Sequence, residues 1–274
     1  MTRSSALEIL EETSRTFAIP IARLSGDTHD AVASGYLCLR AIDEIEDHDE
    51  LPVATKVEVL RGISRTLQEV GDKLGASAFD PVFTTAGART GLPEVTLRLA
   101  EWANLAPGQI APRVHDATAT MAERMAGWAE AGWQVNTRAD LDRYCFSVAG
   151  AVGLLLSDIW AQCAAIRTDR RLAVAFGRGL QSVNIARNRA EDANRGVDFY
   201  PGGWTDANMY AYARGNLAGA DAYTAALPPG EVREFCAIPL ALAHATIDTL
   251  DGGREKLSRI DVSEIVAGVL EPAG

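Results

Sequence analysis

The sequence has 274 residues, of which 47% are hydrophobic, and its 26 Lys and Arg against 37 Asp and Glu give a net charge of −11. Its basic residues are scattered, so nucleic acid is not an expected partner. The length is sufficient for one large core, and no change in composition marks a linker. We therefore predict a single domain over residues 1–274.

Segments that would direct the chain to a membrane or an oxidising compartment are not evident. No run of eighteen apolar residues occurs, and residues 1–9 lack the apolar centre of a signal peptide. The four cysteines are far apart and have no CxxC spacing, which indicates buried thiols. We expect a cytoplasmic protein without an integral membrane segment, and the sequence does not indicate an oligomeric state.

Taken in chain order, the predicted elements are all helices. Apolar residues recur at i, i+3, i+4 and i+7, and alternating β-branched residues are almost absent. About ten helices in an antiparallel bundle are predicted. The predicted breaks are near residues 20, 51–52, 71–75, 93, 107–112, 137–138, 168–169, 201–203 and 228–229. Thr137, which begins TRAD, is a predicted N-cap because an acid follows three residues later.

A polar stripe runs along the predicted helix YLCLRAIDEIED. Tyr36, Arg40, Asp43 and Asp47 stand at 0, +4, +7 and +11, within about 60° of one another on a helix. The two aspartates are one turn apart and repel each other, more strongly if they face an enclosed space. A positive group is therefore expected between them.

A second stripe with similar spacing lies in QSVNIARNRAED. Gln181, Asn184, Asn188 and Asp192 stand at 0, +3, +7 and +11, within about 80°. Either stripe alone is also explained by an ordinary solvated helix face. Together they favour a hard cation, because carboxylates with little imidazole or thiolate nearby suit Mg²⁺, which also takes phosphate ligands. The expected arrangement has both stripes sharing an Mg²⁺-bound diphosphate, with direct contacts from Arg15, Arg40 and Arg187.

Five segments, in order, resemble the squalene and phytoene synthase family of all-α prenyltransferases, and especially its squalene synthase branch. They are SRTFA (14–18), YLCLRAIDEIED (36–47), RYCFSVAGAVG (143–153), LQSVNIARNRAED (180–192) and FCAIPLALAHATIDTL (235–250). Tyr144 matches a tyrosine implicated in catalysis in that family. The resemblance implies an isoprenoid synthase-like fold around a deep central cavity, with Mg²⁺-dependent ionisation of an allylic diphosphate.

The resemblance also implies roles for individual residues. Catalysis is assigned to Tyr144, Asp43, Asp47 and Asp192, and metal binding to Asp43, Glu46, Asp47, Asn188 and Asp192. Substrate binding is assigned to Ser14, Arg15, Phe17, Tyr36, Arg40, Phe146, Val148, Val152, Gly153, Leu156, Gln181, Asn184, Arg187 and Phe235. Gly150 and Gly153 each cost about 1 kcal/mol in a helix. Close approach of substrate or of another helix would explain them equally well.

Three departures from the family pattern shape the expected function. In the segment LQSVNIARNRAED, which resembles the family's second acidic motif, Asn188 replaces the usual first aspartate. Val197 replaces an arginine four residues before Pro201. No region linked to NADPH-dependent reduction follows. We expect a prenyltransferase of secondary metabolism that moves the prenyl group of a prenyl diphosphate to an aromatic, carbazole-like acceptor. The alternatives are head-to-head coupling to presqualene or prephytoene diphosphate, and a non-catalytic isoprenoid-binding protein.

Overall fold

The computed structural model describes residues 3–69, 74–85, 87–89 and 91–271, and no strand occurs in these ranges. Its contacts divide the chain into two compact units, residues 1–133 with 158–165, and residues 134–157 with 166–274. The all-α prediction is confirmed. The prediction of a single domain around a deep central cavity stays a prediction, and each unit is described by itself below.

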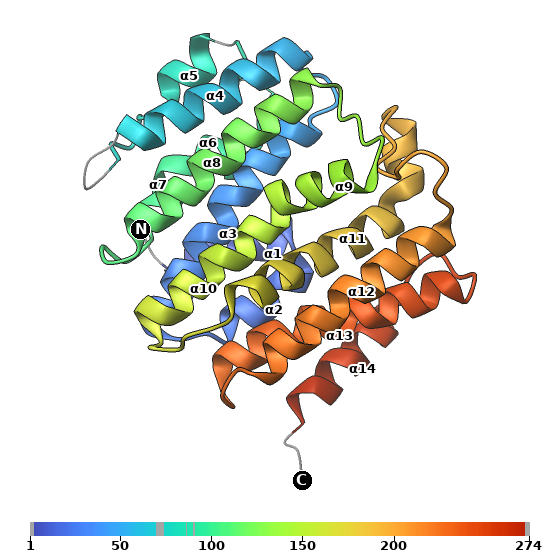
Figure 1. Cartoon of the computed structure of the whole chain (residues 1–274). Coiled ribbons are helices and arrows are strands. Elements are labelled where there is room, and N and C mark those ends of the chain that lie inside the picture. The colour runs from blue at the N-terminus through green and yellow to red at the C-terminus, as the bar shows by residue number, and fades with distance from the viewer. Residues whose placement is uncertain (1–2, 70–73, 86, 90, 272–274) are drawn as a thin grey trace. The chain divides into compact units, whose positions relative to one another are not determined.

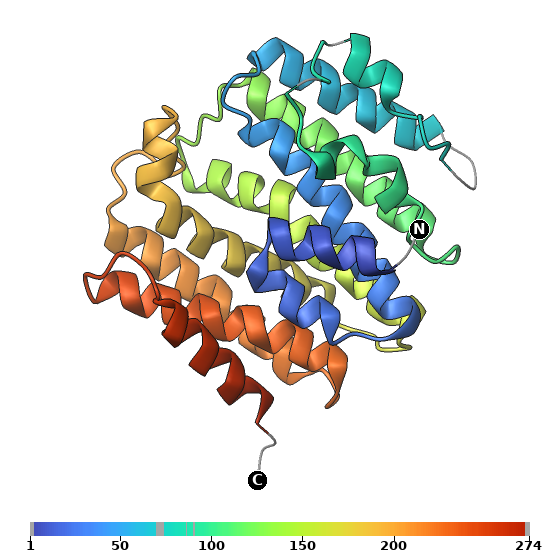
Figure 2. The ribbon, with the colours of Figure 1, turned by 180° about the vertical axis from the view of Figure 1, so that it is seen from behind.

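Unit 1 is built on one long, mostly buried helix. Its helices are α1 (Arg3–Thr13), α2 (Arg15–Ala22), α3 (Gly26–Asp47), α4 (Val53–Glu69), α5 (Asp80–Thr85), α6 (Glu94–Leu97), α7 (Leu99–Ala103) and α8 (Ala111–Glu130). Helices α1, α2, α4, α6, α7 and α8 all contact α3. Figure 1 shows α4 alongside α8, and Figure 2 shows α1 and α2 from the opposite side. As a result, α3 is the centre of this unit's core.

Unit 2 contains a second group of helices that pack against one another. Its helices are α9 (Arg138–Cys145), the π-helix η1 (Phe146–Gly150), the first half of α10 (Ala151–Cys163), α11 (Arg170–Asn194), α12 (Asp206–Ala225), α13 (Glu231–Asp251) and α14 (Arg259–Leu270). Helices α11, α12 and α13 contact one another, and α11 also contacts α9 and η1 (Figure 1). The helix that carries the second polar stripe is therefore central to this unit.

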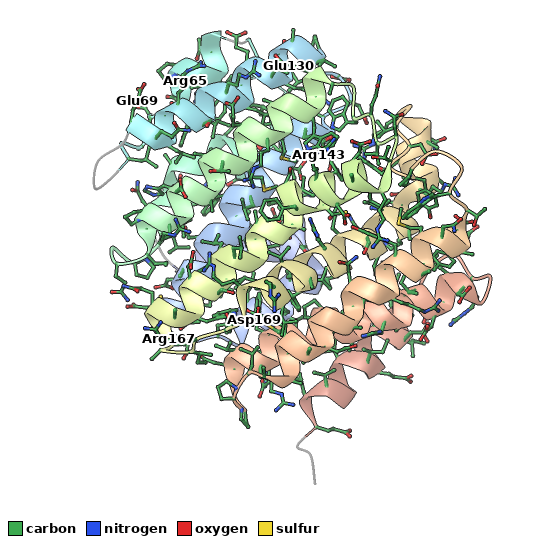
Figure 3. All side chains as sticks on the ribbon, viewed as in Figure 1. Arg65, Glu69, Glu130, Arg143, Arg167 and Asp169 are labelled. Carbon is green, nitrogen blue, oxygen red and sulfur yellow. The ribbon has the colours of Figure 1, made fainter. Side chains whose placement is uncertain are left out.

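Several predicted boundaries are confirmed by cap geometry. Thr137 accepts a hydrogen bond from Asp140 N, and the Asp140 carboxylate accepts one from Thr137 N, which completes a capping box. Asp169, labelled in Figure 3, accepts from the first backbone amides of α11. The break expected near Pro20 is wrong, because Pro20 lies inside α2 and the chain breaks on either side of that helix, at Ser14 and Arg23.

The number of helices also exceeds the predicted ten in the described part of the chain. Helices α5, α6 and α7 have only four to six residues each, too short to give a periodic pattern. Three of the four cysteines, Cys38, Cys145 and Cys236, are buried free thiols, as predicted, whereas Cys163 is half-buried. Burial raises the pKa of Cys38 to about 12.

One helical stretch, Arg138–Cys163, is long and apolar enough to cross a membrane by length and composition. Of its most apolar window, 56% is buried inside the molecule, as in the core helix of a soluble protein, and such a stretch alone is weak support for a membrane span. The sequence analysis overlooked it because polar residues interrupt the apolar run. It contains η1, where Ala151 N donates to Phe146 O across five residues.

The glycines of this stretch are explained by helix packing. A Cβ atom on Gly153 would lie 2.0 Å from Ala173 O, and one on Gly177 would lie 2.1 Å from Ala149 O. Backbone carbonyls cannot yield as a flexible side chain can, so α11 approaches η1 and α10 this closely only where a side chain is missing. The contact favours close helix packing as the reason for Gly153, and its assignment to substrate binding stays a prediction.

Replacing Gly153 with Ala is expected to destabilise the protein by about 1–3 kcal/mol or more, because the new methyl group must push two helices apart. The measurement is the free energy of unfolding in urea. Gly215→Ala on α12 is the matched control, since no atom lies within 4 Å of its added Cβ. This control should gain about 0.5–1 kcal/mol from better helix propensity. Equal stability of the two variants would refute the packing explanation.

Candidate active site

The first polar stripe is the partly exposed face of an otherwise buried helix. In the second half of α3, Leu37, Leu39, Ile42 and Ile45 are buried in the core of unit 1. The predicted stripe is half-buried; its members are Tyr36, Arg40, Asp43 and Asp47, with Glu44 and Glu46 beside them. The face of α3 that the sequence singled out therefore does carry its polar groups outside the core.

The segment SRTFA packs against the start of this face. Ser14 is the N-cap of α2 and accepts a hydrogen bond from Phe17 N at 3.3 Å. The rings of Phe17 and Tyr36 are tilted toward each other with centroids 5.5 Å apart. Burial raises the pKa of Tyr36, and a hydrogen bond with Ser14 opposes that rise. Arg15 begins α2, but its side chain lies outside the described residues.

The Arg40 guanidinium is only partly satisfied within the protein. It forms an i, i+4 ion pair with Glu44, a partner that the sequence analysis missed although the spacing could have indicated it. Its Nε atom is buried and has no hydrogen-bond partner in the structure. A buried donor without an acceptor is costly, and a phosphate oxygen would satisfy it. This atom supports the assignment of Arg40 to diphosphate binding.

Asp43 is the acid most affected by its surroundings. Burial raises the pKa of its carboxyl to about 7; the charge of Arg40 opposes this rise, whereas Asp47 and Glu44 add to it. A carboxylate in such surroundings gains from a nearby cation. The last two turns of α3 carry the carboxylates of Asp43, Glu46 and Asp47. Carboxylate oxygens are the ligands that a hard divalent ion prefers.

No group of three or more His, Cys, Asp or Glu side chains within the described ranges is already close enough to hold a metal by itself. Mg²⁺ is usually bound through one or two carboxylates, with water and substrate phosphates completing its coordination. If bound, the ion would supply charge to neutralise the diphosphate and to assist its departure.

The second polar stripe, on α11, is held by arginines. Arg187 Nη2 donates to Asn184 Oδ1 at 2.8 Å, and Arg187 Nε donates to Asn188 Oδ1 at 3.0 Å. Asp192 is buried and its carboxylate pairs with Arg195 at 2.6 Å. The amide oxygen expected to bind metal is thus engaged by a cation. Asn188 fits Mg²⁺ poorly in this arrangement, because Arg187 already donates to its amide oxygen.

Tyr144 lies among aromatic and charged groups of unit 2. It is buried, and its ring stacks on Phe199 with centroids 4.4 Å apart. Two residues earlier, Asp142 accepts a hydrogen bond from Tyr212 Oη at 2.8 Å, and its backbone carbonyl accepts one from Arg178. Arg178 is also a residue that the sequence analysis missed; its Nε is buried without a hydrogen-bond partner. The π faces here can stabilise a nearby cation.

The remaining predicted substrate contacts differ in exposure. Gln181, Phe146, Val148 and Val152 are half-buried, Leu156 and Phe235 are buried, and Arg187 is exposed. The Arg178 guanidinium lies 5.9 Å from the ring centroid of Phe146. Their contact with substrate, and the sharing of one anion by the two stripes, stay predictions.

The model of the squalene/phytoene synthase family matches residues 10–209. The chain belongs to the squalene/phytoene synthase family. The match covers all the acidic residues of both stripes. The family resemblance identified from the sequence is thereby confirmed.

Individual relatives agree with this assignment. The chain is 30% identical over 271 residues to a squalene synthase of Schizosaccharomyces pombe, covering 88% of this chain and 58% of that protein. It is 29% identical to one of Eremothecium gossypii, covering 91% of this chain and 62% of that protein. The rat enzyme is 31% identical, covering 70% and 45%. The chain thus spans about half the length of these curated relatives.

Solved structures confirm the fold. A complex of TcSQS with the ligand BPH1237 matches with a TM-score of 0.78 and 24% identity, covering 98% of this chain and 86% of that chain. A dehydrosqualene synthase in complex with ligand matches with a TM-score of 0.67 and 18% identity, covering 97% and 94%. These solved structures therefore share the all-α fold of this chain.

Replacing Asp43 with Asn should stabilise the metal-free protein more at pH 8 than at pH 5. Between about pH 4 and pH 7 the folded protein holds a proton that an unfolded aspartate has lost, so stability falls as pH rises through this window. Asparagine removes that dependence, with an expected gain of about 1–3 kcal/mol at pH 8. Thermal unfolding in EDTA is the measurement, and a gain that does not depend on pH would contradict the raised pKa.

The variant Asn188→Asp is expected to bind Mg²⁺ more tightly, by a few-fold, because it adds a charged ligand while Arg187 competes for it. The affinity is measured by calorimetric titration. Asn194→Asp, at the exposed end of the same helix, makes the same chemical change away from the stripe and should leave the affinity unchanged. An unchanged affinity for Asn188→Asp would indicate that this face does not contact metal.

Proposed function

We propose that this protein is an Mg²⁺-dependent enzyme that joins two prenyl diphosphates head to head. The observation that carries the proposal is the α3 face, where an unsatisfied arginine Nε lies one turn from a carboxylate whose pKa is raised by burial. Membership of the squalene/phytoene synthase family and relatives named squalene synthase support this function.

The proposed reaction breaks a C–O bond, a C–H bond and one π bond, and it forms two carbon–carbon bonds. The C–O bond of one allylic diphosphate breaks, and pyrophosphate leaves with the bonding electrons. The resulting allylic cation is attacked by the carbon–carbon double bond of the second prenyl diphosphate. Loss of a proton then closes a cyclopropane ring, so the products are one cyclopropyl diphosphate, one pyrophosphate and one proton. The proton passes to the pyrophosphate or to Tyr144.

The residues of this chain serve two parts of that reaction. Arg40 binds a diphosphate oxygen, and Asp43 and Asp47 supply the carboxylates for the cation that accompanies the anion. The rings of Phe17 and Tyr36, in the same unit as Arg40 and Asp43, offer π faces that stabilise a carbocation without attacking it. This aromatic pair serves the cation, and the carboxylates and arginine of α3 serve the departing anion.

No observation favours transfer to an aromatic acceptor, which was the function expected from the sequence. That expectation rested on three departures from the family pattern, above all on Asn188, because a weaker second acidic segment was taken to suit a single diphosphate. One amide in place of a carboxylate lowers the charge of a metal site without removing its capacity for phosphate. The matched relatives are named squalene synthases, so coupling of two prenyl diphosphates replaces the earlier hypothesis.

Purified protein incubated with Mg²⁺ and farnesyl diphosphate alone is expected to form a cyclopropyl diphosphate together with an equal amount of pyrophosphate. Mass spectrometry of the product and a pyrophosphate assay measure both. Geranylgeranyl diphosphate is tested in parallel to define chain length. Formation of prenylated product only when an aromatic acceptor is added would overturn the proposal.

In the same assay Asp43→Ala is expected to lower turnover by more than about 100-fold, because it removes a proposed metal ligand. Asp49→Ala is the matched control, since Asp49 is an exposed acid just beyond the end of α3. It should retain activity. Far-UV circular dichroism verifies that both variants remain helical, and normal turnover by Asp43→Ala would refute the site assignment.

A further inference from the structure

A buried lysine on α4 contacts the backbone of α3 at the turn that carries Glu46 and Asp47. Lys56 lies in the first turn of α4 and is only 8% exposed. Its Nζ donates a hydrogen bond to the backbone carbonyl of Glu46 at 2.5 Å, and it lies 5.6 Å from the ring centroid of Trp133. All three residues belong to unit 1, and neither Lys56 nor Trp133 was among the predicted site residues.

A buried position in the first turn of a helix is unfavourable for a lysine side chain. Lysine is rarely buried unless it is paired, because desolvation of the ammonium is costly. The first turn of a helix is also the positive end of its dipole, which disfavours a cation there. The benefit of Lys56 must therefore come from the groups outside α4 that it contacts.

Those groups lie at the C-terminal, negative end of α3. Glu46 O is one of the last four carbonyls of α3, which lack a partner within the helix. The carboxylates of Asp43, Glu46 and Asp47 occupy the same two turns, at the negative end of the α3 dipole. An ammonium that binds this carbonyl both caps the helix and opposes the concentrated negative charge.

A second contact at this helix end supplies no fixed charge. His48, the C-cap of α3, accepts a hydrogen bond from Glu50 N at its Nδ1 atom. Its Nε2 atom lies 2.8 Å from Gly91 O, which can only accept, so that nitrogen carries the proton. Lys56 is thus the group with a fixed positive charge at the capped carbonyl.

We infer that Lys56 is a positioning residue for the metal–diphosphate site: it holds the Glu46–Asp47 turn of α3 in the helical geometry that directs Asp43 and Asp47 to a shared cation. The inference rests on the proposed function for the identity of that cation. Lys56 does not contact substrate in this role; it acts through the backbone of the turn that bears the carboxylates, and Trp133 holds the ammonium in place.

The test compares Lys56→Met with Lys256→Met, which makes the same change at an exposed lysine. Mg²⁺ is titrated calorimetrically into each protein in the presence of inorganic pyrophosphate, with pyrophosphate alone as the blank. Lys56→Met is expected to bind Mg²⁺ about tenfold more weakly, the usual effect of losing a group that orients a metal ligand. Lys256→Met should match the wild type, and thermal unfolding of all three is recorded.

Each alternative predicts a different result. If Lys56 has only a structural role, Lys56→Met melts at a lower temperature but binds Mg²⁺ normally. If only its charge matters, the variant binds Mg²⁺ more tightly, because a repelling cation has been removed. Either result would overturn the inference. A wild type that binds no Mg²⁺ with pyrophosphate would instead overturn the proposed function, and the inference with it.

A second variant maintains the test if Lys56→Met does not fold. Trp133→Leu keeps the hydrogen bond to Glu46 O and removes the aromatic face beside the ammonium. It is expected to weaken Mg²⁺ binding by about threefold, less than the loss of the lysine, because cation–π contacts are weaker than hydrogen bonds to charged groups. An affinity equal to that of the wild type would count against the inference.

Discussion

The candidate site depends on negative charge concentrated at the end of one helix. Asp43, Glu46 and Asp47 lie in the last two turns of α3, where the helix dipole is already negative. Like charges one turn apart repel each other, and burial of Asp43 makes its ionised form still less favourable. The arrangement persists because core packing fixes α3 and because positive groups offset the charge. Arg40 acts on the exposed face, Lys56 acts at the helix end, and the proposed cation completes the balance.

The polar groups of helix α11 are neutralised in a different way. Its amides and its buried acid are engaged by Arg187 and Arg195, so the stripe is already paired with positive charge. The sequence spacing, which is similar in the two stripes, suggested equivalent chemistry. The contacts differ: the carboxylates of the α3 face would gain from an added cation, whereas the polar groups of the α11 face are already paired with arginines. A guanidinium offers several fixed donors and is well suited to phosphate, so the second face is compatible with direct anion binding.

Much of the fold could be predicted from sequence because it depends on local patterns. The helical period identified the polar face of α3, and the acid three residues after Thr137 identified the start of α9. The break expected at Pro20 failed because a proline within a short helix can be tolerated when the chain breaks a few residues away. The role of Gly153 was left open, since a missing Cβ has no meaning until the carbonyl of Ala173 is known to lie beside it.

The site was predictable to the extent that its residues share one helix face. Tyr36, Arg40, Asp43 and Asp47 are neighbours by spacing alone, and Glu44 could have been added by the same rule. Lys56 and Arg178 could not be found in this way, because each acts on a backbone carbonyl of another helix. Backbone acceptors leave no mark in a sequence, so the groups that orient a site are harder to recognise than those that line it.

The π-helix η1 has a consequence for how the stretch from Arg138 to Cys163 is understood. A π-turn is wider than an α-turn and holds about one more residue, so the angular phase of the side chains shifts by about 100° between α9 and α10. Tyr144 and Leu156 therefore cannot be placed on a single helical wheel. Any chimera or redesign that regularised this turn would rotate one half of the stretch against the other, even if every side chain were retained.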